Sequence, residues 1–449
     1  MESELSKTLR VELMFCGVAG HSLNTQLNDY RQKPNLIEVS EAHQKLFIGG
    51  RNILKVFELL PNCTIKLCHD IEISQDPNSE INSLKVSSIN DEEVLLVALS
   101  GKVLLFWVYD LFVPPTYYVN SESELLHNSI WNFCCKKSLL AAGLNSHKVA
   151  VWDLNSGRYN RMLLHEHSVS SVDISPCGKL LSSTSFDCTV VAVNEFGEVI
   201  SCRPSVEWGW SVKWIKKSSV ADYSHLGPSN MTNLRGRYSS EVYSTTYFND
   251  RTTQETQRRL EGLPDFEEII SDGSYSEEDS FEVPDQTGSS TNDAFSEYFL
   301  VQSTKFSVHL IDPSINPKQQ ENSMHVLAVY LPNLDSSVFN FKRLSLLEYI
   351  EELSLVVLGN HGGKEVFLLR IGKAKKRDTE CVSYPSLQFS YSFVCEKVIY
   401  LDSNLAGLVV SKDLQDSVVA RVFCYTEEDK LFVYQVKKHK DALIYDISI

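Results

Sequence analysis

A loop with two histidines, followed by a serine and an aspartate, holds the side chains with which this chain could do chemistry. His165-Glu166-His167 lies just before an apolar strand pattern, and Ser183 and Asp187 lie around the next turn. Two imidazoles could ligate Zn²⁺, but no third ligand is positioned nearby. The same groups could form a catalytic triad, yet single Ser, His and Asp residues in strands are common, and the sequence has no GxxxxGKS/T, HExxH or GxSxG motif. We therefore predict no metal, no cofactor and no enzymatic activity.

These residues belong to a repeated strand-turn-strand pattern between residues 128 and 215. The first copy ends in the dipeptide Trp152-Asp153, and the second contains the histidine loop with Ser183 and Asp187. Spacing of this kind is that of WD repeats, each of which forms a four-stranded propeller blade of about 40 to 45 residues. The pattern predicts an all-β fold, a seven-bladed WD-repeat-type β-propeller with a long disordered acidic insertion.

Hydrogen bonding explains the spacing of the second copy. In a regular blade, a His before the first strand, a Ser or Thr on the second, an Asp in the next turn and a Trp on the third form a buried polar chain. We assign the first three roles to His167, Ser183 and Asp187, while Val193 stands where the Trp would be. In the first copy the Trp is present, but the other positions hold Ala142 and Ser146. We therefore expect the blades to be held mainly by apolar packing, with Trp152 and Asp153 at a blade turn and Trp152 largely buried.

The rest of the chain divides by composition and strand pattern. Residues 1–34 form an N-terminal segment with a candidate closing strand, and residues 35–217 form blades one to five, the fifth only in part. Residues 218–297 are the predicted disordered insertion, because they are polar and lack sustained periodicity. Residues 298–449 complete the ring, with blade six expected over 325–371 and blade seven over 391–438. The last residues, ALIYDISI, alternate well enough for one more closing strand.

Charge and cysteine usage limit the environment. The formal charge is −16. Residues 261–298 hold twelve acidic side chains and no Lys or Arg, which leaves about −4 for the remainder and argues against direct nucleic-acid binding. Eleven irregularly spaced cysteines indicate a reducing compartment, and the polar start of the chain has no signal peptide. The apolar run over residues 94–115 is long enough to span a membrane, but Ser100-Gly101-Lys102 interrupts it, so we predict two buried strands and no membrane association.

The insertion carries two candidate functional signals. An acidic and apolar stretch, LEGLPDFEEII, is a candidate docking motif for a partner's groove, through Leu260, Leu263, Phe266, Ile269 and Ile270. Directly after it, Ser274 and Ser276 have acidic residues three positions on, the pattern that acidophilic kinases read. The alternative is that the whole stretch is a solubilising acidic spacer.

A series of strings occurs in one order from residue 35 onward. It contains NLIEV with KLFIGGRNILKVF, INSLKV with EEVLLVALSGKV, SIWNF with AGLNSHKVAVW, GWSVKWI before an acidic insertion, LEYIEELSLVVLGNHGGKEVFLLRI, and LAGLVVS with ARVFCYTEEDKLFVYQV. This order, with the turn Asn145-Ser146-His147 and the motif Trp208-Gly209-Trp210, resembles the fungal WD-repeat proteins described as regulators of ribonucleotide reductase gene transcription. The resemblance implies a non-enzymatic protein linked to nucleotide-pool control and to a cullin-type ubiquitin ligase.

We therefore expect a scaffold or adaptor that binds other proteins, among them a cullin ubiquitin ligase module, in the cytoplasm and nucleus. Two alternatives from other classes stay open at this point, a nucleic-acid- or chromatin-associated propeller and a propeller enzyme. Receptors that dock on cullin ligase adaptors often carry Trp-Asp-any-Arg at the end of a blade. Here Trp152-Asp153-Leu154-Asn155 lacks that Arg, and Arg158 lies too far on.

Overall fold

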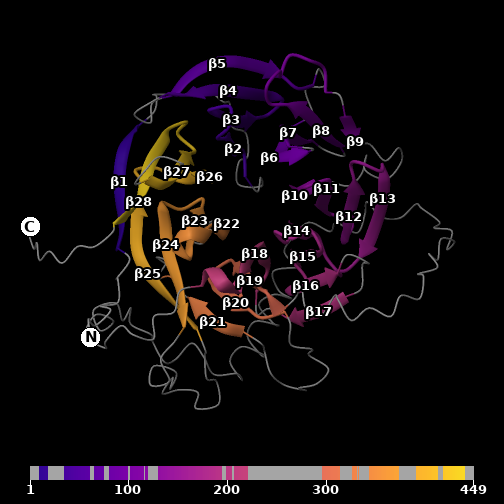
Figure 1. Ribbon diagram of the computed structural model, residues 1–449, viewed down its shortest axis with the longest axis vertical. Helices are drawn as coiled ribbons and strands as arrows, with labels where there is room; N and C mark the ends of the chain where they lie inside the picture. The colour runs from indigo at the N-terminus through magenta and orange to yellow at the C-terminus, as the bar shows by residue number, and fades with distance from the viewer. Residues whose placement is uncertain are drawn as a thin grey trace, which may run out of the picture.

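Strands make up almost all of the described chain. The computed structural model describes residues 10–18, 35–60, 65–74, 80–89, 91–99, 102–115, 117–119, 130–194, 199–204, 207–220, 296–313, 326–330, 332, 343–373, 391–412 and 418–439. Its strands β1 to β28 form antiparallel sheets around a central axis, with β2, β6, β10, β14, β18, β22 and β26 nearest that axis (Figure 1). Counted by these inner strands, there are seven blades of four strands, so the prediction of a seven-bladed β-propeller is confirmed.

Blades 1 to 4 each consist of four strands that follow one another along the chain. Blade 1 contains β2 (Ile37–Ser40), β3 (Lys45–Gly50), β4 (Ile53–Leu59) and β5 (Ile65–Glu72). Blade 2 contains β6 (Ile81–Ile89), β7 (Glu92–Leu99), β8 (Lys102–Trp107) and β9 (Tyr117–Val119). Blade 3 contains β10 (Ile130–Lys136), β11 (Leu139–Leu144), β12 (Lys148–Asp153) and β13 (Arg158–Leu163). Blade 4 contains β14 (Val169–Ile174), β15 (Leu180–Ser185), β16 (Thr189–Asn194) and β17 (Val199–Pro204).

Blades 5 to 7 are less regular along the chain. Blade 5 contains β18 (Gly209–Lys216), the 3₁₀ turn η4 (Lys217–Ser219), β19 (Tyr298–Thr304), β20 (Val308–Ile311) and β21 (Val326–Tyr330). Blade 6 contains β22 (Arg343–Ile350), the 3₁₀ turn η9 (Glu351–Leu353), β23 (Leu355–His361), β24 (Glu365–Lys373) and β25 (Tyr391–Tyr400). Blade 7 contains β26 (Leu405–Lys412), β27 (Val418–Thr426), β28 (Leu431–His439) and β1 (Arg10–Val18). One bridge between His361 and Leu405 joins the sheets of blades 6 and 7.

The first and last described strands close the ring. β1 pairs antiparallel with β28 from Arg10 opposite His439 to Val18 opposite Phe432, so the N-terminal segment supplies the fourth strand of blade 7. The predicted closing strand at residues 442–449 lies outside the described residues. Closure of this kind pairs the strand edge that an open ring would leave free.

This closure corrects two predicted blade boundaries. β21 pairs with β20, so it is the outer strand of blade 5 and not the first strand of blade 6. β25 pairs with β24, so it ends blade 6 and does not begin blade 7. The prediction was wrong because blade 7 takes its fourth strand from the N-terminus. The outer strands of blades 5 and 6, β21 and β25, were therefore each assigned to the blade that follows them. The polar segments before β21 and β25 therefore lie inside blades and not between them.

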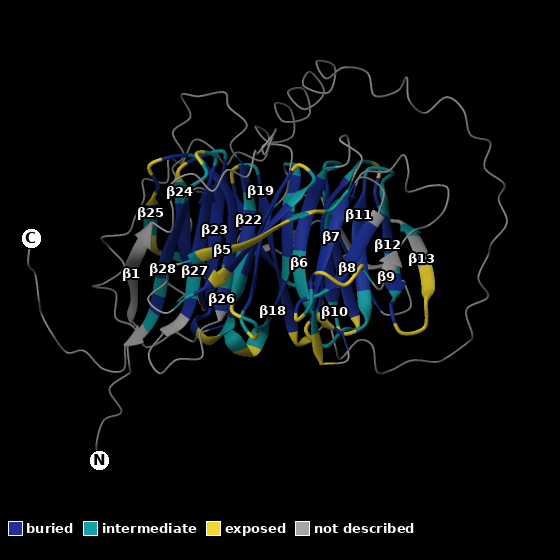
Figure 2. Cartoon of the chain, turned by 90° about the horizontal axis from the view of Figure 1, so that it is seen from above, coloured by how far each residue is buried: buried dark blue, intermediate teal, exposed yellow. Residues whose placement is uncertain are grey.

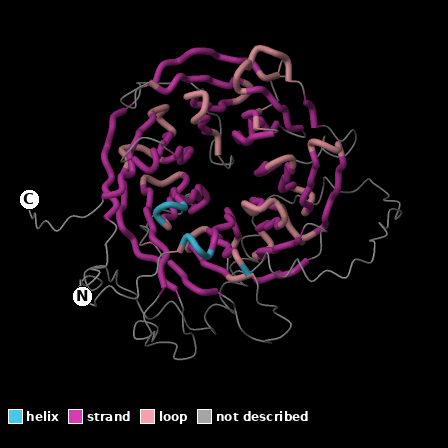
Figure 3. Tube along the Cα trace, in the orientation of Figure 1, coloured by secondary structure: helices cyan, strands magenta, loops and turns pink. Residues whose placement is uncertain are grey.

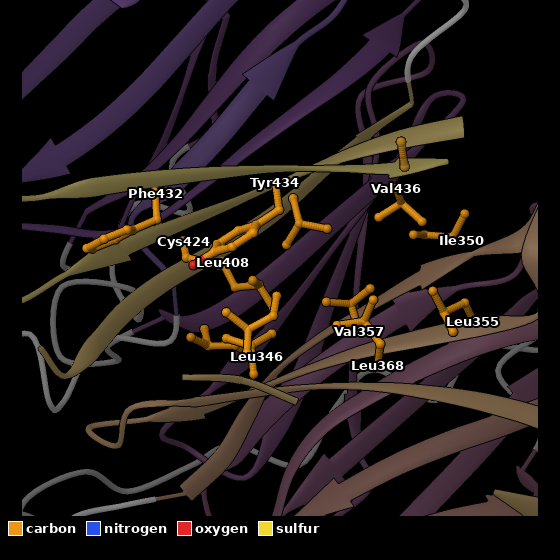
Figure 4. Close-up of a cluster of buried hydrophobic side chains, with 14 of the residues drawn as sticks. Leu346, Ile350, Leu355, Val357, Leu368, Leu408, Cys424, Phe432, Tyr434 and Val436 are labelled. Atoms are coloured by element: carbon orange, nitrogen blue, oxygen red, sulfur yellow. The ribbon is translucent and has the colours of Figure 1, made fainter. Parts of the chain in front are cut away.

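Apolar side chains on both faces of the sheets form the core, because each blade packs against two neighbours. Figure 2 shows buried strands with partly exposed and exposed turns at both ends of the ring. Each buried cluster joins two adjacent blades, as Figure 4 shows for Leu346 and Val357 of blade 6 against Leu408 and Phe432 of blade 7. Trp152 lies in such a cluster between blades 2 and 3 and is 7% exposed, as predicted.

Strand direction defines two faces of the ring. Successive strands in a blade are antiparallel, so the connections between blades and the turns between second and third strands lie at one end, which we call the top face. The other turns lie at the opposite end, the bottom face. Figure 3 shows the short loops and turns that connect the strands. Several inner strands have a bulge near the top, where the extra residue is Asn82 in β6, Trp131 in β10, Ser170 in β14 and Trp210 in β18.

The long insertion leaves and re-enters the ring at one place on the bottom face. The Lys217 N–H donates to the Glu297 carbonyl at 2.8 Å, just beyond the pairing of Lys216 with Tyr298. Lys217 also binds Asp312 at 3.0 Å, and the Ser219 hydroxyl lies 2.7 Å from the Tyr349 hydroxyl of blade 6. The two ends therefore lie together, as the split blade requires. Disorder was predicted over residues 218–297. Residues 218–220 and 296–297 are described and form turns at the two ends, and residues 221–295 lie outside the described residues.

The apolar run over residues 94–115 forms strands and not a membrane helix. β7 and β8 pair from Val94 opposite Trp107 to Leu99 opposite Lys102, so the interruption at residues 100–102 is the turn between them. Among the described residues, no helix is long and apolar enough to cross a membrane.

Candidate functional site

His165 is the centre of the buried polar network of blade 4. Its Nδ1 lies 3.1 Å from Asp187 Oδ2, and its Nε2 lies 2.7 Å from Ser183 Oγ. The Thr189 hydroxyl donates to Asp187 Oδ1 at 2.6 Å. Because ionised Asp187 can only accept, Nδ1 of His165 is the donor in this contact, and Nε2 on the other side of the ring faces the Ser183 hydroxyl. Ser183 and Asp187 therefore have their predicted roles.

The prediction of His167 in this network is wrong. The Asp187 carboxylate also accepts the Glu166 N–H at 2.9 Å, and this bond holds the preceding residue, His165, inside the blade. His167 follows two residues later, on the other side of that contact. Its Nδ1 accepts the Ser168 N–H at 2.7 Å, and its ring lies on the top face. Both histidines fit the sequence spacing, and backbone hydrogen bonding decides between them.

The network has the order of a catalytic triad but holds a turn. Burial alone would raise the pKa of Asp187, but hydrogen bonds from His165, Thr189 and the Glu166 N–H outweigh burial and lower it well below its usual range. Ser183 is 0% exposed and His165 is 5% exposed, so no substrate can reach the hydroxyl. A nucleophile must contact its substrate, so the geometry supports a structural role.

Trp152 and Asp153 also have structural roles, in blade 3. The Trp152 ring packs 5.1 Å from the ring of Tyr159 on the neighbouring strand. The Asp153 carboxylate accepts the Asn155 N–H at 3.1 Å and the Ser156 hydroxyl at 2.7 Å, which caps the turn between β12 and β13. These bonds lower the pKa of Asp153, with Ser156 as the main cause.

A second group of Ser, His and Glu side chains, which the sequence did not indicate, joins blades 1 and 2 on the bottom face. Ser40 donates to Glu93, and His43 Nδ1 lies 3.1 Å from the same carboxylate oxygen and 3.4 Å from Ser40 Oγ. A triad needs Ser and carboxylate on opposite nitrogens of the imidazole. Here both lie on Nδ1, so the group links two blades and cannot relay a proton.

Six aromatic rings form a half-buried cluster on the top face, which we call the aromatic cluster. Its members are Trp131, His147, His167, Phe186, Trp208 and Trp210. Phe186, in the turn between β15 and β16, is the centre, with ring centroids of Trp210 at 4.7 Å, Trp131 at 5.2 Å and Trp208 at 5.6 Å. His167 lies 5.9 Å from Phe186 and stacks on His147 at 6.0 Å. Blades 3, 4 and 5 therefore meet in one aromatic surface.

Two bulges and one glycine position this cluster. A bulge re-aims the side chain of its extra residue, and Trp131 and Trp210 are the extra residues of the strands on either side of blade 4. The Trp131 indole N–H donates to Asn145, which fixes its ring. Gly209 lies against blade 4 so closely that a Cβ there would overlap the Thr184 hydroxyl. The motif Trp208-Gly209-Trp210 thus places two indoles around one close approach of the backbone.

Two basic side chains, His167 and Arg343, determine the charge at the aromatic cluster. Burial, followed by the neighbouring His147, lowers the pKa of His167, so that ring is neutral at pH 7. The Arg343 guanidinium of blade 6 lies over the Trp210 ring, 4.2 Å from its centroid, on a side chain that is 6% exposed. The cluster is therefore continued toward blade 6 by a cation stacked on an indole.

The central channel, in contrast, is lined by compensated charges. Ion pairs join adjacent inner strands at 3.2 Å for Lys85 and Glu38, 3.4 Å for Lys136 and Asp173, and 2.8 Å for Lys213 and Glu348. Burial acts to raise the pKa of both Glu348 and Glu38. At Glu348, Lys213 and Lys85 outweigh burial and lower the pKa, whereas at Glu38 burial outweighs Lys85 and the pKa is raised. Each acid of these three pairs thus faces a lysine across the channel space of about 560 Å³, open ends included.

An exposed apolar patch lies on the bottom face and rim of blades 1 and 2. Phe112 is 68% exposed, Tyr109 58%, Leu67 47% and Val113 40%. The Phe112 ring makes an edge contact with His69 at 4.7 Å, which connects the β8–β9 loop to β5. This patch is a second surface on which a partner could bury apolar area.

The other predicted functional residues lie outside the described residues. They are the candidate docking residues Leu260, Leu263, Phe266, Ile269 and Ile270 and the candidate phosphorylation sites Ser274 and Ser276. Within the described ranges, no group of three or more His, Cys, Asp or Glu side chains could hold a metal ion.

Comparisons with known proteins found one similar sequence and one similar structure that bear on the fold. No protein-family model matches the chain. A WD40 repeat-containing protein of Dictyostelium discoideum is 29% identical over 204 residues, which cover 42% of this chain and 28% of that protein. A chain in a crystal structure of the mitotic checkpoint complex superimposes with a TM-score of 0.55 at 10% identity, over 97% of this chain and 95% of that one.

The structural match shows the β-propeller fold, and the sequence match shows similarity to a WD40 repeat-containing protein over part of this chain. The match spans less than a third of the Dictyostelium protein. It therefore indicates the kind of protein and not a particular partner.

Proposed function

We propose that this propeller is a non-enzymatic scaffold that binds partner proteins through the aromatic cluster. The observation that carries the proposal is the position of three of the six tryptophans of the chain, Trp131, Trp208 and Trp210, in half-buried top-face positions around Phe186. A Trp that only filled the core would lie between blades, as Trp152 does. Trp and Arg dominate the binding energy of many protein interfaces, where they cluster near the centre.

The opposite face supports a scaffold with more than one partner. The insertion is rooted on the bottom face through Lys217 and Glu297. In this proposal the docking motif over residues 260–270 binds a partner other than the one on the top face. In this proposal the rigid ring holds two partners on opposite faces, and phosphorylation of Ser274 and Ser276 tunes the partner of the insertion.

The resemblance to regulators of ribonucleotide reductase gene transcription extends the proposal to the identity of the partners. It suggests a role in ribonucleotide reductase expression and association with a cullin ubiquitin ligase, in the cytoplasm and nucleus. The turn after Trp152 lacks the Arg of adaptor-docking receptors, and Asp153 binds Asn155 and Ser156 of its own turn. In this proposal a cullin module reaches the chain through the aromatic cluster or the insertion.

Affinity purification with mass spectrometry tests the proposal. Tagged wild type is compared with Trp208→Ala, with Phe112→Ala in the exposed patch, and with Phe266→Ala combined with Ile269→Ala in the insertion. Tyr400→Ala is the control, because Tyr400 is 74% exposed on the outer strand of blade 6 and belongs neither to the aromatic cluster nor to the exposed patch. We expect Trp208→Ala to lose one set of partners and the insertion variant another. Identical partner sets for wild type and Trp208→Ala, with folding unchanged, would refute the role of the aromatic cluster.

The proposed link to ribonucleotide reductase expression and to a cullin ubiquitin ligase is tested separately in the same cells. A cullin among the partners of wild type, and altered ribonucleotide reductase transcript levels after deletion of the gene, are the expected results. If neither result is found, the proposed link to ribonucleotide reductase and the cullin ligase is refuted, and the proposal of a protein-binding scaffold remains.

A further inference from the structure

Carboxylates flank the aromatic cluster at three places, and this suggests what kind of side chain it binds. Glu166 precedes His167, Asp187 follows Phe186, and Glu207 precedes Trp208. Glu166 is exposed, and its N–H donates to Asp187 at 2.9 Å. Glu207 accepts the Phe306 N–H at 3.2 Å and the Thr304 hydroxyl at 2.5 Å. In the sequence, three loops of two blades thus carry a carboxylate residue next to a ring of the cluster.

Two of these carboxylates act on the thiol of Cys188, which lies in the turn that carries Phe186. Cys188 follows Phe186 and Asp187 in the same turn. Burial raises the pKa of the thiol to about 11, with Asp187 and Glu207 as the next contributors. Both carboxylates therefore act on the same point, although they come from different blades. A cation placed there would be stabilised by the same charges.

Cations of the protein already use aromatic rings in this region. Arg343 lies over Trp210, and Lys305 lies over the exposed Phe306 ring at 4.9 Å. The face of an indole attracts a guanidinium because the ring carries partial negative charge on its face. Arg343 covers Trp210 from the side of blade 6, and Trp208 and Phe186 lie toward blade 4.

We propose that the aromatic cluster binds an arginine side chain of a partner protein, which stacks on the rings of Trp208 and Phe186 and is balanced by Glu166 and Glu207. This inference rests on the proposed function and names its partner chemistry. A purely apolar segment would have to strip water from two carboxylates without pairing them. An acidic segment would be repelled by them. An arginine can stack its guanidinium on the rings and pair its positive charge with the two carboxylates.

Fluorine NMR of the full chain labelled with 5-fluorotryptophan tests the inference. The six tryptophans give separate probes, which Trp→Phe variants assign. The ligands are a Gly-Ser peptide with two arginines and its counterparts with lysine, citrulline or glutamate. We expect the arginine peptide to shift the resonances of Trp208, Trp210 and Trp131, but not that of buried Trp152. Buried Trp152 is the internal control, so shifts confined to the resonances of Trp208, Trp210 and Trp131 report binding at the cluster.

The expected affinities follow the order arginine, lysine, citrulline, with citrulline about tenfold weaker than arginine. Glu166→Gln and Glu207→Gln should each weaken the arginine peptide about threefold, and Tyr400→Ala should not change it. A citrulline or lysine peptide that binds as tightly as the arginine peptide, or unmoved resonances of Trp208 and Trp210, overturns the inference. If Trp208→Ala removes cellular partners while the arginine peptide has no effect, the proposed function stands and this inference fails.

Discussion

Blades 3 and 4 are neighbours with the same strand-turn-strand spacing, and they stabilise it differently. In blade 4 the turn between the second and third strands is held by His165, Ser183 and Asp187. In blade 3 the equivalent positions are Ala142 and Ser146. The buried Ser146 hydroxyl has no hydrogen-bond partner among the described residues. Blade 3 instead has Trp152 where blade 4 has Val193, and both are buried.

The difference shows that the blade turn needs one good anchor and not a complete set. A charged network fixes the turn of blade 4 through directional bonds. The large Trp of blade 3 fixes the strand after the turn by packing against blade 2. Turn geometry is common to both, because His147 and Cys188 adopt positive φ at the same position. Either anchor therefore preserves the repeat, and each can be removed separately.

Removal of the apolar anchor should have the largest effect. Trp152→Ala leaves a cavity between blades 2 and 3, and truncation of a buried Trp costs about 3 to 5 kcal/mol. We expect the free energy of unfolding in a urea titration to fall by that amount. Val193→Ala, at the same position of blade 4, is the matched control and should cost about 1 to 2 kcal/mol less, since fewer atoms are lost. Equal costs would mean that Trp152 is not the anchor of blade 3.

Removal of the polar anchor should come next. His165→Ala deprives Asp187 and Ser183 of their shared partner inside the blade, and we expect a loss of about 3 kcal/mol in the same titration. His167→Ala is the control two residues away, and its half-buried ring should cost about 1 kcal/mol or less. A larger effect of His167→Ala would restore His167 as the network histidine and contradict the hydrogen bonds of blade 4.

Features that depend on neighbouring residues could be predicted from the sequence, and features that depend on contacts between distant segments could not. Apolar alternation and turn residues were sufficient for the number of blades, because six of the seven blades consist of strands that follow one another along the chain. The outer strands β21 and β25 were misassigned, because the N-terminal strand that completes blade 7 is far away in sequence. The histidine was misplaced by two residues, because the choice depends on one backbone bond to Asp187. The aromatic cluster was not predicted, since Trp131, Phe186 and Trp208 meet only when three blades stand side by side.

The charge of the blade 4 anchor gives it a pH dependence that blade 3 lacks. The pKa of Asp187 is lower in the folded protein than the value near 3.9 of an unfolded chain. Its stabilisation is therefore fully present above about pH 4 and is lost as pH falls toward the folded pKa. Asp187→Asn should cost about 2 kcal/mol at pH 7.

Melting of Asp187→Asn and wild type from pH 7 to pH 3 measures this dependence. The difference in melting temperature between wild type and Asp187→Asn should decrease as pH falls below about 4. Trp152→Ala serves as the comparison, because its difference from wild type has no such charge. A gap between wild type and Asp187→Asn that stays constant over this range would mean that the carboxylate charge does not hold the turn.

The smallest effect is expected in blade 5, where the chain between the first two strands is interrupted by the insertion. Replacement of residues 221–295 by a Gly-Ser linker about a quarter as long should stabilise the ring by about 1 kcal/mol, because closure entropy grows by about 0.6 kcal/mol per doubling of loop length. The strand pairing itself is kept, since Lys217 still bonds Glu297 and β18 still pairs with β19. Thermal melting followed by circular dichroism measures the result. If packing between blades stabilises blade 5 as it stabilises blade 3, the variant keeps a cooperative melting transition. Loss of that transition would mean that the insertion is part of the folded core.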